Sequence, residues 1–202
     1  MTRAAMALIL AFALTNHVFA GDAPRIVMST SEGDIEIELY PEQAPITAGN
    51  FLKLVDSSKL DGGSFYRVVT YDNDRGSPKI EVIQGGRGDS LEGEIEAIDH
   101  ETTEQTGIRH TDGVISMARG GVGTATSEFF IVIGDQPGLD YGAPRNADQQ
   151  GFAAFGKVVR GMEVVRRIQQ LPANGPSDSD YTKGQILNDP VSIASVRRIA
   201  QE

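Results

Sequence analysis

The segments FYRVV at residues 65–69 and IEVIQGG at residues 80–86 decide the fold class of this chain. Both are short and rich in β-branched and aromatic residues, a composition that favours strands. The polar stretch between them contains Gly76 and Pro78, which indicate a loop, and a glycine pair ends the second segment. We therefore predict two short strands joined by a loop.

The same pattern of short strands and turns extends in both directions. Residues 35–39 alternate apolar with acidic side chains after a turn at Gly33-Asp34, so they form a half-buried strand that pairs with residues 25–30. The remaining strands are predicted at residues 114–118, 128–133, 152–159 and 191–196.

Two short helices interrupt the strands. The first is predicted over residues 45–59, where Pro45 suits the first helical position. Its apolar face is made by Phe51, Leu54 and Val55. The second begins at Gly161, and its apolar face is made by Val164, Val165 and Ile168.

About eight strands and two helices, without βαβ alternation, place the chain in the mainly β class. Many short strands separated by glycine-rich turns indicate a barrel or a sandwich. Two helices are too few to cover both faces of a parallel sheet, but they suit the two open ends of a barrel. Closing the barrel also removes exposed sheet edges.

Residues 1–20 have the layout of a secretory signal peptide. Arg3 lies near the start, an apolar run covers residues 4–14, and the small side chains of Val18 and Ala20 precede Gly21. The apolar run is shorter than the ~20 residues of a membrane span; an uncleaved anchor is the alternative. We therefore expect one domain over residues 21–202, exported to the periplasm or beyond the cell, without stable membrane insertion after cleavage.

Charge and composition exclude several classes of function. The net charge is −10, so a nucleic-acid partner is not expected. The chain has no cysteine, which excludes disulfides, thiolate nucleophiles and cysteine-based zinc sites. Beyond residue 20 only His100 and His110 remain, and their spacing matches no local zinc motif. We expect no metal and no cofactor.

Six segments, in order and spacing, resemble the cyclophilins. These are FYRVV at 65–69, VIQGG at 82–86, SMA at 116–118, SEFFI at 127–131, Leu139-Asp140, and FGKVVRGM at 155–162. The resemblance runs from about Ile26 to Val196. It implies a closed eight-stranded antiparallel barrel capped by two short α-helices, with a substrate groove on its outside. It also implies a monomer that isomerises X-Pro bonds of polypeptides without a cofactor.

Arg67 is the catalytic candidate that the resemblance implies. Rotation of a peptide bond is opposed by a barrier of about 18–20 kcal/mol, so catalysis needs donors that favour the twisted amide. A guanidinium stays charged and offers several N–H groups in a fixed fork. From the residues alone, an exposed arginine on a strand is the favoured interpretation of Arg67, since arginine is usually exposed.

The resemblance further implies a set of substrate-binding residues. Phe130 forms the apolar wall of a proline pocket, although core packing is the alternative for either Phe129 or Phe130, which alternate along one strand. Gln84 binds the peptide and helps to hold Arg67. The other implied contacts are Val82, Ala118, Arg119, Glu128, Leu139 and Phe152.

Five positions depart from the pattern of well-known eukaryotic cyclophilins: Glu81, Arg119, Glu128, Gly138 and Phe152. Glu81 stands where an aromatic pocket residue is usual, so either part of the wall is missing or a nearby loop residue replaces it. Glu81 and Glu128 are also candidates to pair with Arg67 or Arg119. The loops at residues 70–79 and 141–150 are longer than the minimal pattern and are expected near the groove.

Three functions remain open on the sequence. The first is a prolyl isomerase that assists the folding of exported proteins. The second is a catalytically weak chaperone or scaffold that holds proline-containing segments on the same barrel. The third is an acid/base hydrolase, for which no carboxylate pair has a motif.

Overall fold

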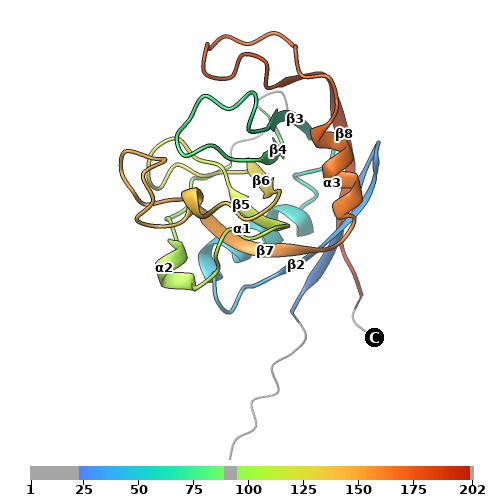
Figure 1. The fold of residues 1–202 in the computed structure, drawn as a ribbon. Coiled ribbons are helices and arrows are strands. Elements are labelled where there is room, and N and C mark those ends of the chain that lie inside the picture. Colours follow the sequence, from blue (N-terminus) through green and yellow to red (C-terminus); the bar gives the residue numbers. More distant parts are fainter. Residues whose placement is uncertain (1–22, 89–94, 201–202) are drawn as a thin grey trace, which may run out of the picture.

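Eight antiparallel strands form a closed barrel in the computed structural model, which describes residues 23–88 and 95–200 (Figure 1). Around the barrel the order is β1-β2-β7-β5-β6-β4-β3-β8. The strands are β1 (Arg25–Thr30), β2 (Gly33–Leu39), β3 (Ser64–Val69), β4 (Val82–Gly86), β5 (Val114–Met117), β6 (Phe129–Val132), β7 (Ala153–Arg160) and β8 (Ile186–Arg198). The closed antiparallel barrel predicted from the sequence is confirmed. The predicted signal peptide, residues 1–20, lies outside the described residues.

The hairpin of β1 and β2 shows how the alternating pattern builds the core. Ile35, Ile37 and Leu39 are fully buried, while the acidic residues between them point outward. On β1, Ile26 and Met28 face the same core. One buried and one solvated face is what period-two alternation produces in a barrel strand.

The last strand closes the barrel, because β8 pairs with β1 on one side and with β3 on the other. It begins at Ile186 rather than at residue 191, where the sequence predicted it. The reason is the Asp189-Pro190 step, which interrupts the strand pattern. In the structure this step lies where the β3–β8 register jumps, from Phe65↔Val191 to Arg67↔Ile186.

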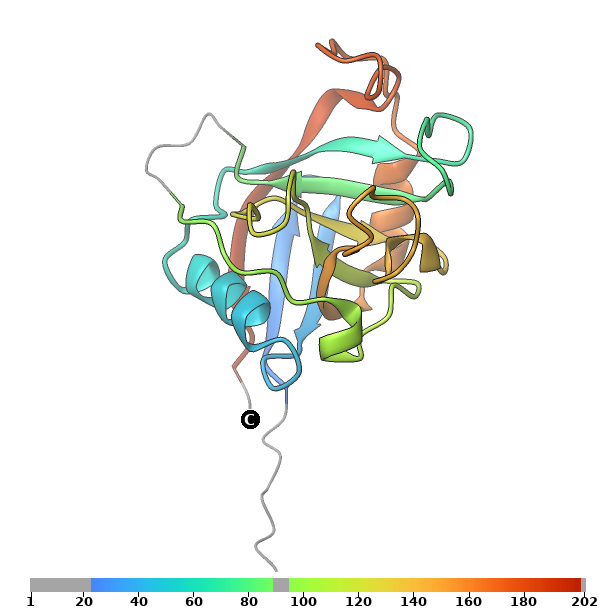
Figure 2. The ribbon, with the colours of Figure 1, turned by 90° about the vertical axis from the view of Figure 1, so that its left-hand side faces the viewer.

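Helices α1 (Pro45–Asp56) and α3 (Met162–Gln169) cover opposite ends of the barrel, as expected (Figure 2). The ring of Phe51 from α1 enters the core, 5.0 Å from the Phe155 ring and 5.5 Å from the Phe129 ring. From α3, Val164, Val165 and Ile168 are buried. None of the helices in the described residues has the length and apolar character that a bilayer span requires.

Two further short helical turns were not predicted, since each is too short to show helical periodicity. They are α2 (Thr103–Thr106) and a 3₁₀ turn (Pro137–Leu139). The sequence does carry a signal for α2. Thr102 and Gln105 form a reciprocal capping box, and Gly107 ends the helix with φ of 74°.

A buried polar chain, Asp140–His110–Ser116, lies behind the outer face of the barrel. The His110 ring Nδ1 is 2.8 Å from Asp140 Oδ1, and its Nε2 is 3.0 Å from Ser116 Oγ. Burial lowers the pKa of His110, and this outweighs the opposing effect of Asp140. The neutral ring therefore donates to Asp140 and accepts from the Ser116 hydroxyl.

This burial predicts a pH dependence of stability. Below the ordinary histidine pKa of 6.5, the unfolded chain binds a proton that the folded chain does not. The free energy of unfolding should therefore fall as the pH drops below that value, by about 1.4 kcal/mol per pH unit for one proton. Urea unfolding of the wild type and of His110→Gln at pH values of about 7.5 and 5.5 measures this. Parallel losses in both proteins would contradict it.

Candidate active site

A single row of residues crosses four neighbouring strands on the outside of the barrel. Arg67 on β3 is paired with Gln84 on β4, Gln84 with Phe130 on β6, and Phe130 with Ser116 on β5. Residues directly opposite each other in an antiparallel sheet share a face. The strand register therefore brings together residues that are up to 63 positions apart in the chain.

A β-bulge at Tyr66 turns Arg67 to this outer face. The β3–β4 pairing runs from Phe65↔Gly85 to Arg67↔Gln84, so Tyr66 is an extra residue on β3. Strict alternation would put Arg67 on the same face as Phe65, which is fully buried in the core. Because of the bulge, Tyr66 and Arg67 both reach Gln84, while Val68 returns to the core.

Two glutamines hold the guanidinium of Arg67. Its Nη1 donates to Gln84 Oε1 at 2.8 Å. Its Nε and Nη2 both donate to Gln185 Oε1, at 2.9 and 2.7 Å. Burial lowers the pKa of Arg67, but the guanidinium remains charged at neutral pH. Three of its five N–H groups are bound, and the other two have no partner among the described residues.

Glu128 supports this arrangement from behind. Gln84 Nε2 donates to Tyr66 Oη at 2.8 Å, and Tyr66 Oη donates to Glu128 Oε2 at 2.6 Å. Burial, followed by the Glu128 carboxylate, raises the pKa of Tyr66, so the phenol keeps its proton. Glu128 thus binds Tyr66, and no ion pair joins it or Glu81 to Arg67 or Arg119 in the described part of the chain.

Gly86 makes room for the Glu128 carboxylate. A Cβ at this position would lie 2.3 Å from Glu128 Oε1, well inside van der Waals contact. The close approach also allows the Gly88 backbone N–H to donate to Glu128 Oε1 at 2.9 Å. Gly86 therefore leaves space for the carboxylate that accepts from Tyr66 and, through Tyr66, orients Gln84.

A cavity of about 230 Å³ opens beside the bulged strand. Eight of the nine predicted site residues line it: Arg67, Val82, Gln84, Ala118, Arg119, Phe130, Leu139 and Phe152. Glu128 is the exception, for the reason given above. The floor is apolar, since Val82, Phe130 and Leu139 are almost fully buried.

Phe130 faces the cavity and Phe129 belongs to the core. Strand alternation predicted that one of the two rings faces outward, and the resemblance assigned that role to Phe130. The Phe129 ring packs edge-on against Phe51 and Phe65 inside the barrel. The Phe130 ring faces the cavity, edge-on to Phe152 with 5.3 Å between centroids. Its other neighbour is His110, stacked at 6.0 Å. The buried polar chain of Asp140, His110 and Ser116 therefore packs against Phe130 through the His110 ring.

The side chain of Arg119 is bound to the protein itself and is only 2% exposed. It donates to both carboxylate oxygens of Asp148, at 2.7 and 2.9 Å, and to the carbonyl of Gly151. Its guanidinium also lies 5.3 Å from the centre of the Phe152 ring. The hydrogen bonds from Arg119 lower the pKa of Asp148 to about 2. Arg119 thus holds the loop at residues 141–150 and the Phe152 wall together.

The other two departures, Glu81 and Gly138, are explained by neighbouring chain segments. Glu81 does not line the cavity, whereas Ile80 and Val82 on either side of it do. At Gly138, an added Cβ would lie 2.4 Å from Pro78 Cγ. The long loop at residues 70–79 therefore occupies the space that a side chain at position 138 would need.

A second ion pair ties the two long loops together beside the cavity. Arg145 donates to both oxygens of Asp74, at 2.8 and 3.1 Å, and the Asp74 side chain is fully buried. Asp74 also accepts from the backbone N–H groups of Gly76 and Ile80. Burial alone would raise the pKa of Asp74, but these hydrogen bonds, first of all that from Arg145, lower it. The carboxylate stays charged.

Several site residues were missed by the sequence reasoning. Those that line the cavity are Val69, Ile80, Arg145, Asn146 and Tyr181, and Gln185 lies behind Arg67. Tyr181 and Gln185 come from residues 170–185, the loop between α3 and β8. No local sequence motif marks them. They are more than 100 residues from Arg67 in the chain, and they come close to it only because β8 pairs with β3 in the barrel.

The chain Asp140–His110–Ser116 has the connectivity of a nucleophilic triad, but it is closed to substrate. Ser116 is fully buried, His110 is 1% exposed and Asp140 is 5% exposed. A nucleophile must reach the reacting carbonyl, and the Ser116 hydroxyl faces only His110. Within residues 23–88 and 95–200, no group of three or more His, Cys, Asp or Glu side chains is placed to hold a metal ion.

Comparisons with known proteins identify the family of this chain. The family model for cyclophilin-type peptidyl-prolyl cis-trans isomerases matches residues 25–197. A peptidyl-prolyl cis-trans isomerase A of Dickeya dadantii is 33% identical over 97% of this chain and 96% of its own length. A peptidyl-prolyl cis-trans isomerase of Acinetobacter baylyi is 33% identical over 85% of this chain and 84% of its own.

The fold has a counterpart among solved structures. A cyclophilin-type isomerase of Cryptosporidium parvum, crystallised in the presence of the dipeptide Ala-Pro, covers 88% of this chain with a TM-score of 0.64 and 22% identity. The comparison covers 99% of that chain. Together with the family match, which extends over nearly all of the barrel, these findings show that the chain belongs to the cyclophilin family of peptidyl-prolyl cis-trans isomerases.

Proposed function

We propose that this isomerase acts on X-Pro bonds of exported polypeptides and that Arg67 is its catalytic residue. The observation that carries the role of Arg67 is its pair of unbound N–H groups at the edge of a cavity with an apolar floor. The reaction needs no nucleophile and no cofactor. It needs a pocket that holds proline and donors that bind the twisted amide more strongly than the planar one.

The cavity suits a single residue of a bound polypeptide. Its volume of about 230 Å³ is below the ~300–1,000 Å³ of pockets that hold drug-sized ligands. The proline ring packs against Phe130 and Leu139, while Phe152 closes one side. A proline residue has no backbone N–H to donate, so its ring must be bound by apolar contacts. The apolar floor provides these contacts.

The two unbound N–H groups of Arg67 then act on the bond itself. One donates to the carbonyl oxygen before the proline, and the other is directed toward the prolyl nitrogen. When the bond twists, amide resonance is lost and the nitrogen lone pair becomes a hydrogen-bond acceptor. The contact to nitrogen is therefore stronger in the transition state than in either planar form, which is the condition for lowering the barrier.

Gln84 and Gln185 serve as positioning residues in this mechanism. The side-chain oxygen of each glutamine accepts a hydrogen bond from Arg67. The side-chain amide of Gln84 donates to the Tyr66 hydroxyl, and that of Gln185 donates to the carbonyl of Asn73. Anchoring both ends fixes which way each amide points. The guanidinium is thus held in one plane before substrate arrives, and this preorganisation removes an entropy cost from the reaction.

Export is supported by the layout of residues 1–20 alone. An exported isomerase would meet proteins as they fold after translocation, when uncatalysed isomerisation takes tens to hundreds of seconds. We therefore place the mature domain, starting at Gly21, in the periplasm or outside the cell.

The role of Arg67 is tested by Arg67→Ala and Arg67→Lys in an NMR-exchange or coupled assay on an Ala-Pro test peptide. We expect kcat/KM to fall by about 10²–10³ in the alanine variant, as when an oxyanion-hole donor is removed. The lysine variant should recover only part of the loss, because it lacks the planar fork. Full activity of Arg67→Ala would refute the mechanism. An inactive wild type would instead favour a module that only binds proline-containing segments.

The positioning role of Gln185 predicts a loss in kcat rather than in KM. Gln185→Leu removes the acceptor of two Arg67 N–H groups, and we expect kcat to fall about tenfold while KM changes little. Gln185→Glu keeps an acceptor oxygen and should retain more activity than the leucine variant. A leucine variant with wild-type kcat and an unchanged melting temperature would show that Gln185 does not position the guanidinium.

Export is tested separately, by N-terminal sequencing of the protein recovered from the periplasm or medium of producing cells. We expect the mature chain to begin at Gly21. Recovery of a chain that begins at Met1 would contradict cleavage, and recovery from the cytoplasm alone would contradict export.

A further inference from the structure

Residues 170–185 form a loop that rises above β3 and β4 (Figure 1). Three contacts near its end tie it to the loop at residues 70–79 and to the catalytic strand. Asn73 Nδ2 donates to the carbonyl of Gly184 at 3.0 Å, and Gln185 Nε2 donates to the carbonyl of Asn73 at 2.9 Å. The backbone N–H of Val68 donates to the carbonyl of Gln185 at 2.8 Å. The end of this loop is therefore held beside Arg67.

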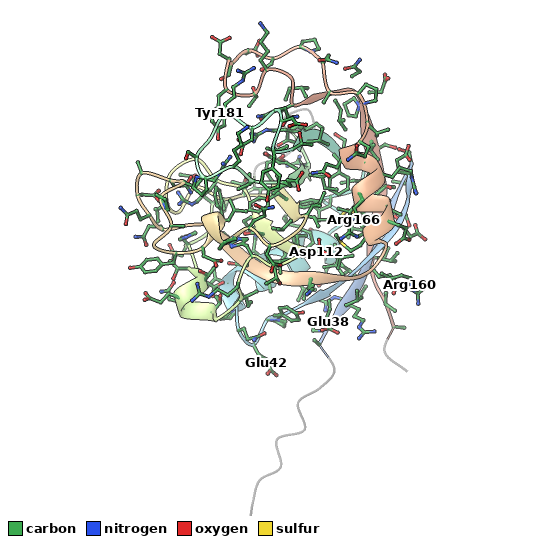
Figure 3. All side chains as sticks on the ribbon, in the orientation of Figure 1. Glu38, Glu42, Asp112, Arg160, Arg166 and Tyr181 are labelled. Carbon is green, nitrogen blue, oxygen red and sulfur yellow. The ribbon has the colours of Figure 1, made fainter. Side chains whose placement is uncertain are left out.

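Tyr181, whose position on this loop is labelled in Figure 3, contacts the catalytic arginine through its ring. The centre of its ring lies 5.8 Å from Cζ of Arg67, within the range of a cation–π contact. Its hydroxyl accepts from Arg145 Nη2 at 3.1 Å. Arg145 is itself fixed by the buried Asp74. The Tyr181 side chain thus makes two contacts: its ring face contacts the Arg67 guanidinium, and its hydroxyl oxygen accepts from Arg145.

Despite these contacts, much of Tyr181 remains exposed to solvent. Tyr181 is 46% exposed and lines the cavity together with Phe130 and Phe152. Phe130 is only 5% exposed, so it forms the floor of the cavity and not its rim. Tyr181 is an aromatic surface at the mouth, next to the N–H groups that bind the carbonyl before proline. The residue that precedes proline carries that carbonyl, so its side chain branches from a Cα bonded directly to the carbonyl carbon.

The resemblance implies an aromatic pocket residue at position 81, but this chain has Glu81 there, and Glu81 does not line the cavity. We propose that Tyr181 is a specificity-determining residue of this isomerase, whose ring packs against an apolar side chain at the position preceding proline. This inference rests on the proposed function, since it places the substrate by its carbonyl on Arg67. The aromatic side chain is then supplied from the α3–β8 loop instead of from position 81.

A rigid aromatic ring favours this role on physical grounds. It offers a large contact area with few torsions to immobilise, so binding a side chain against it costs little entropy. The hydrogen bond to Arg145 and the stacking on Arg67 hold the ring before substrate arrives. The expected substrates are peptides with a bulky apolar or aromatic residue before proline, favoured over peptides with glycine there.

The test compares two peptides that differ only before proline, one with Phe-Pro and one with Gly-Pro, in the wild type and in Tyr181→Ala, Tyr181→Phe and Tyr141→Ala. Tyr141 is a matched control: it is 39% exposed, lies on a neighbouring loop and does not line the cavity. The readout is the ratio of kcat/KM for the two peptides, with KM and kcat measured separately.

We expect the wild type to favour the Phe-Pro peptide and Tyr181→Ala to reduce that preference about fivefold to tenfold, mainly by raising KM for this peptide. Tyr181→Phe keeps the ring and should keep most of the preference, and Tyr141→Ala should match the wild type. An unchanged ratio in Tyr181→Ala, or an equal loss on both peptides, would overturn the specificity role. A wild type without activity on either peptide would instead refute the proposed function.

Discussion

The strand register on one outer face of the barrel is the constraint on which the site depends. Arg67, Gln84, Phe130 and Ser116 lie in one row only because β3, β4, β6 and β5 are paired at these residues. A slip by one residue would move each side chain to the opposite face. The bulge at Tyr66 is part of the same constraint, since it turns Arg67 from the core to the outer surface.

Around this row, each polar side chain is held by a hydrogen bond to the next one. Arg67 is held by Gln84 and Gln185, Gln84 by Tyr66, and Tyr66 by Glu128, whose approach requires glycine at position 86. Behind Phe130, the neutral His110 ring is held by Asp140 and Ser116. Buried polar groups are costly when unpaired, and no buried side-chain N or O atom among the described residues lacks a partner.

Two arginine–carboxylate pairs fix the loops that border the cavity. Arg119 with Asp148 holds residues 141–150 against Phe152, and Arg145 with Asp74 joins that segment to residues 70–79. Both arginine side chains are nearly inaccessible to solvent, at 2% and 6% exposure. For the Arg145–Asp74 pair, in which both side chains are buried, removing one partner is expected to cost about 3–5 kcal/mol, because the other charge is left buried and uncompensated. These loops therefore behave as walls of the site.

Much of the fold could be predicted because its strands carry a clear period of two, as in Ile35, Ile37 and Leu39. Nine site residues were predicted from the resemblance of the sequence motifs to the cyclophilins, and all but Glu128 line the cavity. Residues such as Gln185, Tyr181 and Arg145 could not be found in this way. They lie on loops without periodicity, and only the closed barrel brings them to Arg67. The bulge was also hidden, since FYRVV shows no feature that marks Tyr66 as an extra residue.

The central claim is that Arg67 keeps two N–H groups for the substrate while the glutamines hold the rest. NMR of the ¹⁵N-labelled guanidinium during titration with an Ala-Pro peptide tests this most directly. We expect the Nη resonances of Arg67 to shift with substrate, while the Nε resonance, whose N–H is bound to Gln185, changes little. Unchanged Nη resonances at a peptide concentration that saturates the Phe130 and Phe152 ring signals would contradict it.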